Sequence, residues 1–368
     1  MKLESISVSG FFGKSEFVHY DFHDDLNIIT GRNGSGKTTI LKLAWMIMSG
    51  NIYWALKEVN FKACKLVTSE YTCTVTKTAN MYCRIELETI SGDSYLFEDD
   101  GPNGEYDYQE SSEDQAAPHL IAFGSSIFFP TFRRIEGGFS LDLPRRTKSR
   151  AGNRPVDDID DALTSLSKKM SNDEHLFVAA ISSQDINTLL FQKFASLSEE
   201  INTFQADISR SVIEKIKQHQ NSSTSSRDAE ILLAETREEI EKIETFRTES
   251  MRPLDAVRML VKKLFQHAGI TFDRRLSFGD AAEAVKSDVL SAGEKQMLSF
   301  ICYNAFHQDA IIFIDEPELS LHVDWQRQLY KILKKQNPSN QFIFATHSPF
   351  IYGKYPDKEV AVGVDRGE

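Results

Sequence analysis

Long apolar runs, signal-peptide features and paired cysteines are all missing from this 368-residue sequence. No stretch approaches the roughly 18 apolar residues that a membrane-spanning helix requires, and the N-terminal residues contain no apolar signal-peptide region. The four cysteines form no CxxC pair and have no histidine cluster of zinc-ligand spacing nearby, so we interpret them as reduced structural thiols. These absences predict a cytoplasmic protein with no membrane partner.

Basic residues are also in short supply. The sequence has 42 Lys and Arg residues against 54 Asp and Glu residues, which gives a formal net charge of -12 at pH 7. General binding to polyanions is therefore not favoured, because phosphate contacts need clustered Lys and Arg, although a local basic patch leaves DNA binding open. With 41% hydrophobic and 26% charged residues, the chain is expected to form one large α/β domain with an appendage.

Glycine is absent between residues 160 and 250. In this region Ile201, Phe204 and Ile208 recur at near-helical spacing, and a polar run at 219–226 interrupts the pattern. We predict a helical arm at 161–253, either a hairpin forming a short antiparallel coiled coil or two helices folded flat on the head. The head would then comprise lobe I at 1–160 and lobe II at 254–368, so both ends of the chain build it.

Outside the arm, glycines gather in one loop between an expected strand at 26–29 and an expected helix at 40–48. The segment 31–38 fits GxxxxGK[ST], the Walker A pattern, in which small residues let backbone N–H groups surround phosphates. Lys37 is expected to reach the β and γ phosphates of ATP, and Thr38 to bind Mg²⁺. The candidate ATP-binding residues in this loop are Gly31, Arg32, Asn33, Gly34, Ser35, Gly36, Lys37, Thr38 and Thr39.

A second motif follows the apolar run at 310–314, which predicts a buried strand with Asp315 and Glu316 at its carboxyl end. This is a Walker B pattern. We expect Asp315 to hold Mg²⁺ through water, and the catalytic Glu316 to orient and activate the attacking water. An ordinary helix-capping turn is the alternative for such an acidic pair, but the presence of Lys37 in the same chain favours the Walker B interpretation.

Two further motifs carry a family resemblance. The segment Leu290-Ser291-Ala292-Gly293-Glu294 resembles the signature of ABC ATPases in the variant of SMC, RecF and OLD-like proteins, and His347 resembles their switch histidine. The resemblance implies an ABC-type P-loop head of α/β class, with a mixed sheet and an antiparallel β subdomain. It further implies that Ser291, Gly293 and Glu294 face ATP held by another copy in an ATP-bridged homodimer, and that His347 contacts the γ-phosphate. Ser291 as a plain helix N-cap, with Glu294 completing a capping box, is compatible with this role.

The segment Pro130-Thr131-Phe132-Arg133-Arg134 occupies the place where the family has a Q-loop glutamine, and it contains none. Arg133 and Arg134 are candidates for a phosphate, protein or DNA contact, with a solvated surface pair as the alternative. The preceding residues are expected to form a surface loop at 99–118 and strands at 120–123 and 127–129.

Within the class, the sequence looks most like AAA_15 or AAA_21-type ATPases, which include the ATPase subunit of PARIS-type anti-phage defence systems. The resemblance implies a slow ATPase that acts as a sensor or scaffold and controls a separate effector such as a nuclease or toxin. A homo-oligomer higher than the dimer is left open. The alternative is a RecF- or SMC-like DNA-repair ATPase, which would use basic residues on DNA: Arg133, Arg134, Arg145, Arg146 and Lys148.

Overall fold

The computed structural model describes residues 1–11, 17–99, 111–135, 155–172, 174–181, 183–220, 226–267 and 291–363. The chain divides into two compact units, of which the first comprises 1–182 with 290–368 and the second comprises 183–289. We call the first unit the head and the second the arm. None of the described helices combines the length and the apolar character that crossing a membrane would need.

A six-stranded sheet in the head has only parallel strand pairs. Its four inner strands are almost entirely buried, as their apolar sequences predict. In order across the sheet the strands are β10 (His175–Phe177), β8 (Ser125–Phe129), β12 (Ala310–Asp315), β13 (Gln341–Ala345), β3 (Leu26–Thr30) and β14 (Glu359–Ala361).

Helices cover both faces of this sheet. Consecutive residues of a strand point to opposite faces, so the partners of Phe128 and Phe129 identify the two layers. The ring of Phe128 lies 5.5 Å from that of Trp45 on α1 (Lys37–Met48), whereas the ring of Phe129 lies 4.9 Å from that of Phe300 on α8 (Ala292–Phe306). Helices α1 and α8 therefore pack against the same strand from opposite faces of the sheet.

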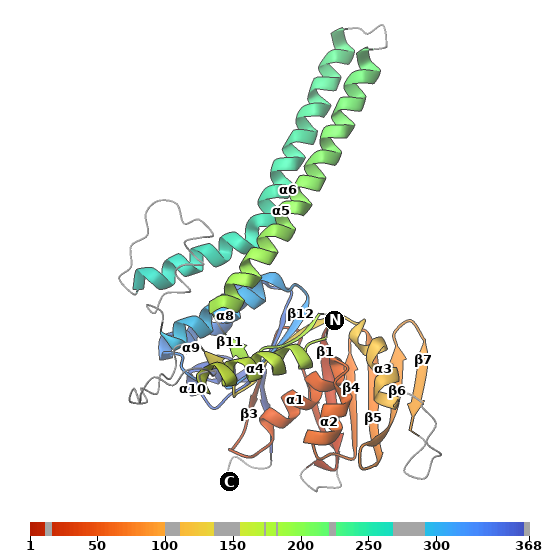
Figure 1. The fold of residues 1–368 in the computed structure, drawn as a ribbon, viewed down its shortest axis with the longest axis vertical. Helices are drawn as coiled ribbons and strands as arrows, with labels where there is room; N and C mark the ends of the chain where they lie inside the picture. Colours follow the sequence, from red (N-terminus) through yellow and green to blue (C-terminus); the bar gives the residue numbers. More distant parts are fainter. Residues whose placement is uncertain are drawn as a thin grey trace, which may run out of the picture. The chain divides into compact units, whose positions relative to one another are not determined.

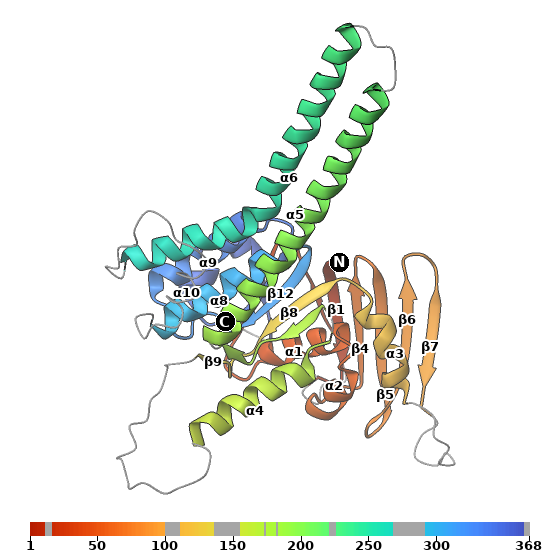
Figure 2. The ribbon, with the colours of Figure 1, turned by 45° about the horizontal axis from the view of Figure 1, so that its top comes forward.

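A second six-stranded sheet is antiparallel, and Figures 1 and 2 show its strands β4 to β7 side by side in orange tones. Residues on β5 and β6 alternate between buried and more exposed positions, which confirms the predicted antiparallel strands there. The α/β class with sheets of both kinds is thus confirmed. The strands are β2 (Val18–Asp21), β1 (Leu3–Ser9), β4 (Ala63–Thr68), β5 (Tyr71–Ala79), β6 (Tyr82–Thr89) and β7 (Ser94–Glu98).

The side chain of Gln341 ties the two sheets together at the start of β13. Its Oε1 accepts from the Leu3 backbone N–H at 2.8 Å, and its Nε2 donates to the Leu3 backbone oxygen at 2.8 Å. The remaining described elements of the head are α2 (Ile52–Glu58), α3 (Ser112–Ile121), β9 (Arg134–Ile135), α4 (Pro155–Met170), β11 (Ala180–Ile181), α9 (Val323–Gln336), α10 (Pro349–Tyr352) and the short 3-10 helix η2 (Pro356–Lys358).

The arm contains the two longest described helices, α5 (Ser183–Gln220) and α6 (Ser226–His267), which run side by side as a hairpin (Figure 2). The rings of Phe204 and Phe246 stack with centroids 4.2 Å apart, and Lys215 forms an ion pair with Glu239. The boundaries differ from the predicted 161–253. Part of that range belongs to the head, because β10 pairs with β8, and α6 continues beyond Pro253 into the predicted lobe II.

The expectation of a loop up to residue 118 and a strand at 120–123 is wrong where the structure describes the chain, because residues 112–121 form α3. Ser111 caps this helix by accepting from the Asp114 backbone N–H, and Ala116 and Leu120 are buried one turn apart. Pro118 lies inside this helix. Residues 100–110 of the expected loop lie outside the described part of the chain.

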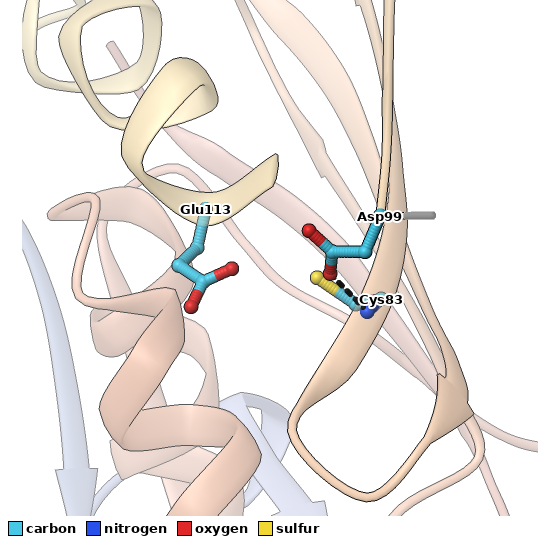
Figure 3. Close-up of side chains that lie close together, drawn as sticks. All are labelled: Cys83, Asp99 and Glu113. Atoms are coloured by element: carbon cyan, nitrogen blue, oxygen red, sulfur yellow. Dashed lines mark hydrogen bonds between the residues drawn. The ribbon is translucent and has the colours of Figure 1, made fainter. Parts of the chain in front are cut away.

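A polar junction attaches α3 to β6, and Figure 3 shows three of its side chains, Cys83, Asp99 and Glu113, whose ligand-type atoms lie within 4.8 Å of one another. The Asp99 carboxylate accepts from the backbone N–H groups of Cys83 at 2.7 Å and Ser112 at 2.8 Å. Among the described residues the Glu113 Oε2 atom has no hydrogen-bond partner, and burial raises the pKa of Glu113. A protonated Glu113 would relieve its repulsion with Asp99, so the junction is accounted for as a structural contact.

Replacing Glu113 with Gln is expected to stabilise the protein at pH 8 by about 1 kcal/mol, because the charged carboxylate is disfavoured by burial. The folded pKa of Glu113 lies above the unfolded value, so the stability of the wild type falls as pH rises above 4.5 and the advantage of Glu113→Gln grows. Urea unfolding at several pH values measures this difference. Glu88→Gln on an exposed site of β6 is the control and should change the free energy of unfolding by less than about 0.5 kcal/mol. An equal effect of both substitutions at pH 8 would contradict the assignment.

Candidate active site

The loop 31–36 connects the buried strand β3 to the N-terminus of α1 and has the backbone that the Walker A pattern predicts. Gly31 has a φ of 155°, and a Cβ atom at this position would lie 2.3 Å from the Val362 backbone oxygen, so only glycine fits. The amine of Lys37 is folded back into the loop and donates to the backbone oxygens of Gly31 at 3.3 Å and Arg32 at 3.4 Å. The lysine therefore stands where it can exchange these carbonyls for phosphate oxygens.

Thr38 and Asp315 meet at the carboxyl ends of β3 and β12. The Thr38 hydroxyl donates to Asp315 Oδ1 at 3.0 Å, and the hydroxyl of Thr131, just after β8, donates to Asp315 Oδ2. Asp315 is fully buried, and burial raises its pKa despite the hydrogen bonds from the two threonines. Hydroxyl and carboxylate oxygens are the donors that Mg²⁺ prefers, and a divalent cation would offset the cost of burying this charge. The residues present thus fit Mg²⁺.

Glu316 and His347 lie beside the lysine. His347 Nε2 is 3.5 Å from Glu316 Oε1 and within hydrogen-bond distance of Lys37 Nζ. Burial, followed by the hydrogen bond and the charge of Glu318, raises the pKa of Glu316 to about 8. Burial and the positive charge of Lys37 lower the pKa of His347. A carboxyl with a pKa near the working pH is suited to accept a proton from water.

Glu316 also has a left-handed backbone with a φ of 49°, which costs a non-glycine residue on the order of 1 kcal/mol. Its backbone N–H donates to the Ala345 oxygen at 2.8 Å, which connects this conformation to the end of β13. Backbone strain of this kind is often found where a side chain must be held in one direction.

Sequence reasoning missed Glu318, which shapes the loop that carries His347. Its two carboxylate oxygens accept from the Thr346 hydroxyl and the His347 backbone N–H, both at 2.7 Å. Thr131 was also missed as a partner of Asp315. The available signals were weak, namely a second acid two residues after Glu316 and a hydroxyl residue directly after a buried strand.

Arg133 is buried, so the expectation of a solvated surface pair is wrong for this residue. It also cannot contact DNA from this position, because its guanidinium donates to three backbone oxygens inside the head. Arg134 lies on β9, and its side chain is outside the described part of the structure, as are residues 145, 146 and 148.

The signature segment begins α8 as a capped helix. The Ser291 hydroxyl accepts from the Glu294 backbone N–H at 3.3 Å, while the Glu294 side chain accepts from the Ser291 backbone N–H at 2.8 Å. A Cβ on Gly293 would lie 2.1 Å from the Ser320 backbone oxygen, so glycine permits α8 to pack on the loop after β12. In the described part of the chain, no hydrogen bond joins Ser291, Gly293 or Glu294 to residues 31–39.

A cavity of about 230 Å³ opens beside the glycine loop. The side chains of Arg32, Ser35 and His347 line it together with the ring of Tyr352, and the end of β14 closes another side. Its full lining consists of Thr30, Gly31, Arg32, Ser35, Thr346, His347, Tyr352, Ala361, Val362 and Gly363.

Comparisons with known proteins identify related families. Residues 153–352 match the family described as "AAA domain, putative AbiEii toxin, Type IV TA system", and residues 5–249 match the family described as "AAA domain", so each match spans more than half of the chain. Retron Vc95 probable ATPase of Vibrio cholerae serotype O1 biovar El Tor is 28% identical over 86 residues, which cover 20% of this chain and 17% of the relative.

Similar solved structures include the Smc head domain from Pyrococcus furiosus, with an extended coiled coil and bound to the C-terminal domain of ScpA. It is 15% identical with a TM-score of 0.38, over 96% of this chain and 91% of that chain. The SMC head domain from Thermotoga maritima is 14% identical with a TM-score of 0.36, over 96% of this chain and 92% of that chain.

If Glu316 is a general base, kcat/KM for ATP hydrolysis should rise with pH and reach its midpoint near pH 8, because the carboxyl must lose its proton to act. Glu318→Gln removes the neighbouring negative charge and should move the midpoint to lower pH. The measurement is kcat/KM between roughly pH 6 and 9.5. Asp324→Asn on the exposed face of α9 is the control and should leave the midpoint unchanged. An unmoved midpoint in Glu318→Gln would refute the coupling between the two carboxyls.

Proposed function

Because the chain belongs to the AAA-domain family of ATPases, we propose that it binds Mg²⁺ and ATP at residues 31–39 and hydrolyses ATP slowly. The observation that carries this proposal is the convergence of Lys37, Thr38, Asp315, Glu316 and His347 at the carboxyl edge of one parallel sheet. Elements separated by most of the chain meet here, and every group has the chemistry that phosphoryl transfer requires.

In the proposed reaction, backbone N–H groups of the loop and the amine of Lys37 bind the phosphates. Thr38 and Asp315 hold Mg²⁺, which supplies positive charge at the phosphate oxygens. Glu316 accepts a proton from the attacking water, and His347 lies where it can contact the γ-phosphate. Glu318 fixes the backbone of His347 and raises the proton affinity of Glu316.

We further propose that two copies form an ATP-bridged homodimer in which Ser291, Gly293 and Glu294 of one copy complete the site of the other. The exposed Ser291 at the N-terminus of α8 supports this proposal, because the positive end of a helix attracts anions. The absence of hydrogen bonds between the described signature residues and the glycine loop of the same chain is consistent with a site shared between copies.

Mixing two inactive variants tests the shared site. Lys37→Ala removes the phosphate contact, and Ser291→Asp keeps a helix N-cap but places a negative charge toward the γ-phosphate. Each variant alone should lose hydrolysis. Their equimolar mixture should recover at most about a quarter of wild-type turnover, because half of the dimers are mixed, each of these has one intact site, and any coupling between the two sites lowers the turnover further.

Two controls belong to this experiment. Ser291→Asn keeps the cap without the charge and should retain most of the activity. Glu316→Gln should bind ATP without hydrolysing it and accumulate as a dimer in light scattering. A mixture that stays inactive and forms no mixed dimer with ATP, while Glu316→Gln dimerises, would show that the two motifs do not meet across the dimer.

For the biological role, we propose a sensor or scaffold of an anti-phage defence system that controls a separate effector such as a nuclease or toxin. The matched family's description names a toxin of a Type IV TA system, and the relative from Vibrio cholerae is named as a retron ATPase. Both names support an ATPase that works together with other components. A DNA-repair ATPase is the second candidate, and the burial of Arg133 removes one of the basic residues on which it depended.

Expression of the chain with its genomic neighbours distinguishes these roles. A defence sensor should co-purify with a neighbouring gene product and reduce phage plaque formation, and Lys37→Ala should lose the protection. A DNA-repair ATPase should instead bind duplex DNA in an ATP-dependent and salt-sensitive manner. If no partner co-purifies and no protection is seen, the defence role is wrong, whatever the rate of hydrolysis.

A further inference from the structure

Arg133 is the buried cation closest in sequence to the expected Q-loop position, and it enters the head from the segment after β8. Only 9% of its surface is exposed. Burial lowers the pKa of its guanidinium to about 10, while the negative charges of Asp315, Glu318 and Glu316 act in the opposite direction. The side chain is therefore a cation at neutral pH in a place where an unpaired charge would be costly.

All hydrogen bonds of this guanidinium that the structure shows go to backbone oxygens. Nη1 donates to the oxygens of Asp315 at 2.7 Å and Pro130 at 2.9 Å, and Nη2 donates to the oxygen of Glu316 at 2.9 Å. Two of these oxygens belong to the proposed Mg²⁺ ligand and the proposed base. Arg133 thus fixes the backbone that carries both side chains rather than pairing with either carboxylate.

The backbone of Glu316 is held on both sides. Its N–H donates to the Ala345 oxygen, and its own oxygen accepts from Arg133. Between these two bonds the residue has its left-handed φ of 49°. A side chain on a strained backbone points in the required direction only while neighbouring groups hold that backbone. The hydrogen bond from Arg133 therefore helps to determine the position of the Glu316 carboxyl group.

Arg133 also touches the signature helix. Its guanidinium lies over the ring of Phe300 at 5.4 Å from the ring centroid, and Phe300 belongs to α8, whose first turn carries Ser291 and Gly293. The same ring packs edge-on against Phe129 of β8, so it has little freedom to move independently. A displacement of α8 would therefore be transmitted through this ring to the guanidinium.

We propose that Arg133 is a positioning residue that aims Glu316 at the attacking water and links that aim to the position of α8 through Phe300. The inference rests on the proposed ATPase function and adds a connection within one chain, from α8 through Phe300 and Arg133 to Glu316. Through this connection, a contact at the signature end of α8 changes the rate of hydrolysis. Arg133 touches neither ATP nor Mg²⁺ in this role, so it governs kcat rather than nucleotide affinity.

Arg133→Lys tests the positioning role, because lysine keeps the positive charge but cannot hold several carbonyls with a planar fork. Turnover should fall at least about tenfold, as expected when a reacting group is misplaced by a fraction of an ångström. The dissociation constant of a fluorescent ATP analogue should stay within about twofold. Arg327→Lys is the matched control, because Arg327 also lies over a ring, that of Phe350, but its exposed side chain pairs with Asp324 rather than with the backbone of Glu316.

Phe300→Leu tests the link to α8, since it removes the ring and keeps an apolar side chain of similar size. It should reduce kcat less than Arg133→Lys does, and the double variant should be no slower than Arg133→Lys alone, because both changes break one connection.

The outcomes separate the two claims. If the wild type and Glu316→Gln hydrolyse ATP equally, the proposed function fails and this inference fails with it. If Glu316→Gln is inactive but Arg133→Lys matches the wild type, only the inference is wrong. If Arg133→Lys loses ATP binding and thermal stability as much as it loses kcat, Arg133 is a merely structural residue. Additive losses of kcat in the double variant would show that Phe300 does not act through Arg133.

Discussion

The candidate site depends on the parallel pairing of four strands, β8, β12, β13 and β3. In a parallel sheet the carboxyl ends lie at one edge, so whatever follows each strand is brought together there. Backbone hydrogen bonds fix the register, with Ile314 opposite Phe344 and Phe344 opposite Ile28. The glycine loop, Thr131, Asp315 and His347 meet for this reason alone. Loss of that register would separate them without altering any one motif.

Buried carboxyl groups are the main electrostatic feature of this edge. The acids Asp315, Glu316 and Glu318 lie near the cations Lys37, Lys42 and Arg133, and the fork of Arg133 is committed to backbone oxygens. Burial raises the pKa of Asp315 and that of Glu316 more than the nearby positive charges lower them. In the proposed site, a divalent cation would offset the negative charge of Asp315, and Glu316, the next residue, would act as the proton acceptor. Burial of both carboxyl groups thus fits the proposed Mg²⁺ binding and base catalysis.

The sequence was sufficient where a motif is local. Glycine spacing predicted the loop at 31–36, and an apolar run ending in acids predicted β12 with Asp315 at its end, because short-range chemistry alone determines both. It was insufficient for Arg133, since nothing in the pattern distinguishes an arginine on the surface from one pointing into the head. It also failed at α3, where a surface loop and a strand were expected but burial of Ala116 and Leu120 stabilises a helix. Tertiary packing decided each of these cases.

The signature helix is connected to the loop of the proposed base within one chain. Gly293 lies against the Ser320 backbone so closely that no side chain would fit, and Gln296 Nε2 donates to the Pro317 oxygen at 3.2 Å. Together with the stacking of Arg133 on Phe300, these contacts join α8 to residues 315–320 at three places. In the proposed dimer, a nucleotide bound by one copy would contact α8 of the other copy and would thereby affect the position of that copy's Glu316. Two independent sites would need no connection between α8 and Glu316, whereas a switch that responds to dimer formation requires one.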